Sequence, residues 1–119
     1  MKNITLMLSF FIATAGLSQN KLEDDKAYNK FYNEGTKMIG EKNFKEALQL
    51  FNEAIALKKT SAEAIFARGT CYLMLNEREK ACIDFNSASK LTYTAAEEYV
   101  KKYCGKNSPG KSQKPINNR

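Results

Sequence analysis

An internal repeat with a period of 34 residues limits the fold more than any other feature of the sequence. Shifting the chain by 34 positions aligns residues 28–61 with residues 62–95 and carries Ala62-Glu63 onto Ala96-Glu97, where a third unit begins. A period of this length is typical of stacked supersecondary units. The identical pairs are Gly35/Gly69, Thr36/Thr70, Ala47/Ala81, Phe51/Phe85, Asn52/Asn86, Ala54/Ala88, Leu57/Leu91 and Thr60/Thr94.

Each unit has the pattern of two α-helices. Apolar residues recur at helical spacing, as in Phe44, Ala47, Leu48 and Phe51, and no stretch alternates with period two. We therefore predict an all-α fold with helices at residues 26–40, 44–58, 62–75, 78–91 and 95–104. Capping boxes are expected at Asn43/Glu46, Thr60/Glu63, Asn76/Glu79 and Thr94/Glu97, and a left-handed C-cap at Gly105.

The repeated residues have the sizes that close helix packing requires. Glycine in each first helix lets the second helix approach its backbone, and alanines do the same from the opposite side. A phenylalanine then fills the wedge where the paired helices diverge. The packing residues are Gly35, Gly69, Ala47, Ala81, Ala54, Ala88, Phe51 and Phe85.

This pattern resembles the tetratricopeptide repeat family over residues 28–95, with a half-repeat to about residue 104. Phe44 and Tyr72 match further family positions, whereas Glu34 and Arg68 stand where the family has leucine. The resemblance implies antiparallel helix hairpins in a right-handed superhelical stack. The expected units are a signal peptide (1–18), an N-terminal linker (19–27), repeats at 28–61 and 62–95, a capping helix (96–105) and a basic tail (106–119).

In this family the first helices line a concave groove that binds segments of other proteins. The resemblance therefore implies a non-catalytic interaction module or scaffold with a protein or peptide partner. Tyr32 and Phe66 are expected as exposed anchors, whereas Ile39, Leu73 and Met74 fit a core equally well. The positions of the family's carboxylate clamp hold Tyr32, Thr36, Ala67, Glu97 and Lys101, of which only Lys101 suits a carboxylate. The groove residues are Asn29, Tyr32, Thr36, Ile39, Gly40, Glu63, Phe66, Thr70, Leu73 and Met74.

The N-terminus has the pattern of an export signal. Lys2 precedes an uncharged, mostly apolar stretch from Ile4 to Leu17, which is shorter than the about 20 residues of a membrane anchor. Gly16 and Ser18 predict cleavage before Gln19, so we expect a periplasmic or secreted protein with no integral membrane segment in the mature chain. The alternative is an uncleaved amphipathic or core helix.

Three cysteines would then lie in an oxidising compartment. Because their number is odd, they cannot all pair within one chain. Exported bacterial repeat proteins that this chain resembles place cysteines like Cys82 and Cys104 in a disulfide, so the resemblance implies this pair. Extending the repeat register unchanged directs Cys104 into the groove, so the bridge requires the last helix to shift or bend. Cys71 is expected to be an inert core thiol.

Composition argues against an enzyme. The chain has no histidine, which excludes histidine bases and histidine-ligated metals, and we expect no cofactor and no metal. Residues 105–112 match the letters of a phosphate-binding loop but follow a predicted helix instead of a strand.

Lys101 to Arg119 contains six basic residues and no acid. This end of the chain could bind anionic surfaces or the cell envelope, which is the alternative function; we expect no nucleic-acid partner.

Overall fold

The computed structural model describes the backbone of residues 2–105 and the side chains of residues 20–105. Every regular element in this range is a helix, which confirms the predicted all-α fold. The elements are α1 (Lys2–Gly40), α2 (Phe44–Leu57), α3 (Ala62–Met74), α4 (Arg78–Lys90), α5 (Thr94–Tyr99) and the π-helix η1 (Val100–Cys104).

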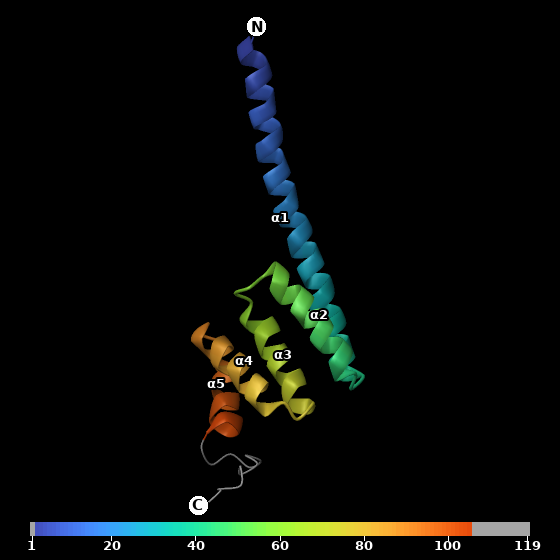
Figure 1. The fold of residues 1–119 in the computed structure, drawn as a ribbon, viewed down its shortest axis with the longest axis vertical. Helices are drawn as coiled ribbons and strands as arrows, with labels where there is room; N and C mark the ends of the chain where they lie inside the picture. Colours follow the sequence, from blue (N-terminus) through green and yellow to red (C-terminus); the bar gives the residue numbers. More distant parts are fainter. Residues whose placement is uncertain (1, 106–119) are drawn as a thin grey trace, which may run out of the picture.

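The helices form two hairpins and a C-terminal cap (Figure 1). Helix α1 packs against α2 and α3 packs against α4, while α2 and α3 join the two hairpins. Helix α5 and η1 both pack against α4. The first helices of the successive units are therefore α1, α3 and α5, as the repeat predicts.

Helix α1 begins far earlier than the predicted residue 26. It includes residues 19–27, for which we predicted a linker, and its N-terminal half extends beyond the body of the hairpins (Figure 1). Residues 19–34 contain no glycine or proline and several strong helix formers, so nothing local ends the helix. No helix in the described part of the chain is long and apolar enough to cross a membrane.

Two clusters of buried side chains hold the units together. Ala47, Phe51 and Cys71 form the first cluster, which joins α2 to α3. The second contains Ile65 and Ala88 of the second hairpin together with Ala96 of α5. Each cluster thus includes a residue from the next unit, so the core continues along the stack. Ala54, Ala81 and Phe85 are also fully buried.

The helix starts differ from the predicted capping boxes. Asn43 is the N-cap of α2, as predicted, but its side chain makes no capping hydrogen bond to the backbone; its Nδ2 donates instead to Glu46 Oε2 at 2.7 Å. The N-cap of α3, however, is Ser61 instead of Thr60, because the Ser61 hydroxyl accepts from the Ala64 N–H at 3.2 Å.

The starts of α4 and α5 are also displaced by one residue, to Glu77 and Tyr93. Asn76 cannot be the cap because it has φ 61° and forms the left-handed residue of the turn. Lys42, at the same position of the first repeat, has φ 60°. The two turns therefore share a conformation that asparagine adopts more readily than lysine.

The C-terminal cap is the largest departure from the expected repeat. A single helix over residues 95–104 was predicted, but the α-helix ends at Tyr99 and continues as η1. Gly105 has φ −68° and ψ 158°, which is extended backbone, so the predicted left-handed C-cap is wrong. The chain leaves the π-helix in a direction that needs no positive φ.

Candidate functional site

The predicted groove residues lie on α1 and α3, the first helices of the two hairpins. Their exposure divides them into two groups. Asn29, Thr36, Gly40, Glu63 and Met74 are exposed, and Met74 is 54% exposed. The half-buried members are Tyr32, Ile39, Phe66, Thr70 and Leu73. Apart from Thr70, the half-buried members are apolar or aromatic, and apart from Gly40 and Met74 the exposed members are polar.

The two repeated threonines bind their own helices. Thr36 Oγ1 donates to the Tyr32 carbonyl at 2.9 Å, and Thr70 Oγ1 donates to the Phe66 carbonyl at 3.1 Å. Because each hydroxyl proton is already used, a partner could use these oxygens only as acceptors.

Tyr32 is not the exposed anchor that we predicted. Its ring stacks on Tyr28 at a centroid distance of 5.9 Å and meets the edge of Phe51, also at 5.9 Å. Burial raises the pKa of the Tyr32 phenol, and the neighbouring Tyr28, Tyr93 and Glu63 raise it further. Tyr32 is thus partly a core residue, with its polar end among phenols and a carboxylate.

Phe66 also differs from the predicted exposed anchor. Its ring centroid lies 5.5 Å from Phe85, 5.2 Å from Tyr93 and 4.9 Å from Tyr99. These contacts tie α3 to α4 and to the cap. We call the half-buried rings of Tyr28, Tyr32, Phe66, Tyr93 and Tyr99 the aromatic strip. Sequence reasoning missed Tyr28, Tyr93 and Tyr99, although each lies close to a repeat boundary or a predicted helix end.

A polar pocket adjoins the strip where α1 meets the turn between α2 and α3. Its volume is about 340 Å³, and Tyr28, Lys58, Thr60, Ser61 and Glu63 line it. Lys58 Nζ lies 4.8 Å from the centroid of the Tyr28 ring. It also forms an ion pair with Asp25 at 3.2 Å.

Hydroxyl groups connect the two walls of this pocket. The Tyr28 hydroxyl and Ser61 Oγ are 2.6 Å apart, and Ser61 Oγ donates to Glu63 Oε2 at 3.3 Å. A serine hydroxyl has one proton, so Tyr28 is the donor to Ser61. The pocket therefore offers a carboxylate, an ammonium group and an aromatic ring within one small volume.

A buried ion pair, which the sequence analysis did not identify, fixes the second hairpin. Arg68 Nε and Nη2 donate to the two carboxylate oxygens of Asp84, both at 2.8 Å. Arg68 Nη1 also donates to Asn52 Oδ1 at 3.0 Å, which links α2 to this pair. The hydrogen bonds from Arg68 to Asp84 raise the pKa of the guanidinium. In the sequence, the signal for this ion pair was Arg68 itself, at a position where the family has leucine.

The structure joins Cys82 of α4 to Cys104 of η1 in a disulfide, with the two Cα atoms 5.6 Å apart. Cys71 is a free thiol that is fully buried beside Phe51. Burial raises the pKa of the Cys71 thiol to about 11. At neutral pH Cys71 is therefore protonated and a poor nucleophile.

The remaining predictions concern metal binding and the basic C-terminal residues. Within the described residues, no group of three or more acidic or cysteine side chains could hold a metal ion. The basic tail (106–119), and with it nearly all of the phosphate-loop-like sequence at 105–112, lies outside the described residues. Lys101 and Lys102 are exposed on η1, and Lys102 Nζ lies 5.0 Å from the Tyr103 ring centroid.

Sequence comparison finds similarity to Sperm-associated antigen 1 of mammals. The rat protein is 27% identical over 70 residues, which cover 59% of this chain and 8% of that protein. The human protein is 29% identical over 73 residues, covering 61% and 8% respectively. Sperm-associated antigen 1 contains tetratricopeptide repeats, so the similarity supports a link to this repeat. The chain spans less than a tenth of the length of these relatives, and no protein-family profile or solved structure matches it.

Proposed function

We propose that this protein is a non-catalytic interaction module that binds an extended segment of another protein along α1 and α3. The observation that carries the proposal is the aromatic strip, in which the Phe66 ring contacts Tyr93 and Tyr99 while Tyr28 stacks on Tyr32. Half-buried rings offer large rigid contact area at little entropic cost. The exposed Met74 extends the apolar surface, and Asn29 and Glu63 supply a polar edge.

The experiment is a selection of linear peptides from a random library on the purified full-length protein. Two exposed apolar residues provide a matched pair of variants: Met74 on α3 is 54% exposed and Ile83 on α4 is 66% exposed. Met74→Lys should weaken binding of the selected peptides at least tenfold, because it places a charge at the groove. Ile83→Lys should leave the affinity within twofold.

Equal loss of affinity in both variants would assign binding to another surface. Failure to select any peptide above background would also contradict the proposal. Neither variant removes a buried side chain, so both should retain the helical circular dichroism of the parent protein.

We further propose that the protein is exported and that residues 1–18 are its signal peptide. The disulfide between Cys82 and Cys104 supports this, since disulfides form mainly in oxidising compartments. N-terminal sequencing of the protein isolated from cells tests the proposal. A mature chain that begins at Gln19 is expected, whereas a chain that retains residues 2–18 would contradict it.

A further inference from the structure

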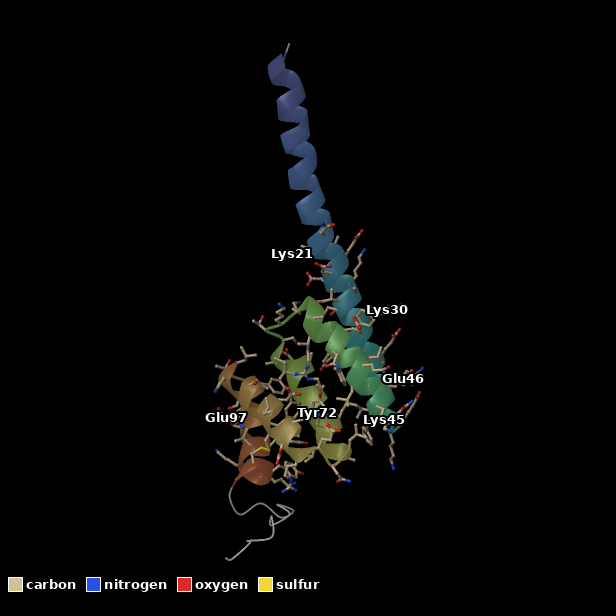
Figure 2. The ribbon with its side chains drawn as sticks, in the orientation of Figure 1. Lys21, Lys30, Lys45, Glu46, Tyr72 and Glu97 are labelled. Carbon is tan, nitrogen blue, oxygen red and sulfur yellow. A yellow bond between two sulfur atoms is a disulfide. The ribbon has the colours of Figure 1, made fainter. Side chains whose placement is uncertain are left out.

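Cys104 occupies the repeat position of two groove residues. Thr36, Thr70 and Cys104 are separated by 34 residues each, and the two threonines lie on the groove helices α1 and α3. An unbroken α-helix through the cap would direct Cys104 to the same face. Cys104 is instead bonded to Cys82 on α4, the outer helix of its hairpin (Figure 2).

The π-helix accounts for this change of direction. Up to Tyr99 the cap keeps the repeat register: Ala96 is fully buried, and the Tyr99 ring lies 4.9 Å from Phe66 and 5.1 Å from Phe85. Val100–Cys104 then form a π-helix, in which the hydrogen bonds span five residues instead of four. One extra residue in a helical turn rotates the following side chains by about 100°. This rotation moves Cys104 from the groove face towards α4.

η1 packs against α4 and α5 through half-buried side chains, and none of its five residues is fully buried. The Tyr103 ring, for example, lies 5.4 Å from the Tyr99 ring. A π-helical turn is rare because the α-helix has better backbone geometry, so it persists where another interaction compensates. The covalent bond between Cys104 and Cys82 ties η1 to α4 and is strong enough to compensate for the π-helical turn.

We propose that the Cys82–Cys104 disulfide is a redox switch that sets the register of the cap. Its reduction returns residues 100–104 to an α-helix and turns the Cys104 thiol into the groove, in line with Thr36 and Thr70. The reductant is a dithiol: one thiolate attacks a sulfur of the disulfide and forms a mixed disulfide, and the second displaces it. Two electrons and two protons pass to the cysteines, and the dithiol becomes a disulfide.

The switch does not depend on the proposed peptide binding, because it concerns only the conformation of the cap. Its consequence is local. The reduced protein would present a thiol in the row that contains two threonine hydroxyls, whereas the oxidised protein directs this thiol to the outer helix. The buried Cys71, at 0% exposure, is shielded from the same reductants.

Solution NMR of the full-length protein tests the proposal. In the oxidised protein, nuclear Overhauser contacts over residues 99–104 should follow the i to i+5 pattern. Addition of dithiothreitol should replace them with i to i+4 contacts and produce new contacts between Cys104 and the side chains of Phe66 or Thr70. Reoxidation should restore the first spectrum.

Two variants test whether loss of the Cys82–Cys104 disulfide is enough to change the cap, without any other effect of the reductant. Cys82→Ser and Cys104→Ser should each show the i to i+4 pattern without any reductant, and Cys71 remains unchanged in both. Iodoacetamide should label Cys104 in Cys82→Ser at least tenfold faster than it labels Cys71. Persistence of the π pattern in both variants would overturn the proposal. Loss of all helical contacts over residues 100–104 would overturn it as well.

Discussion

The ring of Phe51 lies so close to Gly35 that a Cβ atom on this glycine would be 2.9 Å from ring atoms Cε1 and Cζ. The second repeat has the same relationship, since a Cβ on Gly69 would be 2.8 Å from Cε1 of Phe85. Both rings are fully buried. The hairpins therefore close around a phenylalanine that uses the space left by the missing glycine side chain.

Replacement of Gly35 by alanine should destabilise the protein by up to about 2 kcal/mol. Overpacking of a tight core costs about 1–3 kcal/mol, and the better helix propensity of alanine offsets about 1 kcal/mol of this. Gly40→Ala is the control, because no atom outside the local backbone lies within 4 Å of its Cβ position. Urea unfolding measures both variants. Equal stability of the two would contradict the packing role of Gly35.

Removal of Asp84 should cost about 2–3 kcal/mol. Asp84→Ala leaves the Arg68 guanidinium without its bidentate partner, and the Arg68 side chain is only 25% exposed. The exposed pair of Lys37 and Glu41, 3.9 Å apart, serves as the comparison, and Lys37→Ala should change stability by less than about 0.5 kcal/mol.

A double variant tests whether the pair acts as a unit. Arg68→Leu with Asp84→Leu should be more stable than Asp84→Ala alone, because no buried charge remains unpaired. The first repeat has Leu50 at the position of Asp84, so an apolar side chain fits this helix. A double variant whose denaturation midpoint is equal to or lower than that of Asp84→Ala would contradict this prediction.

Replacement of Arg78 by phenylalanine should stabilise the protein by about 1 kcal/mol. Within the described residues, Arg78 Nη1 is buried and has no hydrogen-bond partner. An unsatisfied buried donor costs about 1–3 kcal/mol. Phe44 occupies the same position of the first repeat and packs against the core there. Thermal unfolding should show a higher Tm for Arg78→Phe and a lower Tm for the reciprocal Phe44→Arg.

The buried thiol should make stability fall at high pH. The pKa of Cys71 is raised from 9.0 to about 11 in the folded protein, so its protonated form is favoured there. The resulting stabilisation is complete below pH 9 and is lost as the pH rises from about 9 to about 11, because the unfolded chain releases this proton first. The difference in unfolding free energy between Cys71→Ala and the parent protein should change over this range. A difference that stays constant with pH would contradict the raised pKa of Cys71 in the folded protein.

Much of the fold was predictable because its signals are local or periodic. The helix bounds of α2, α3 and α4 agree with the predicted ranges within one residue. The paired glycine and phenylalanine positions were evident from a 34-residue shift of the sequence. Helix α1 was predicted poorly, since the expected start rested on a presumed linker whose residues favour a helix.

The candidate site was less predictable because it depends on which side chains meet across helices. Tyr32 and Phe66 were correctly expected on the first helices, but ring contacts with Phe51 and Tyr99 make both half-buried. The bond between Arg68 and Asp84 joins residues 16 positions apart and follows neither helical periodicity nor the repeat.

The α2, α3 and α4 helices, the pairing into hairpins and the small residues at the contacts follow from the sequence alone, because a 34-residue period imposes the same local geometry on each unit. The end of the stack, in contrast, depends on a contact between helices that no local pattern reveals. Beyond Tyr99 the chain exchanges the α-helical register for a π-helix, and Cys104 meets Cys82 instead of the groove. A covalent bond between two helices can outweigh the modest preference of five residues for regular backbone hydrogen bonds.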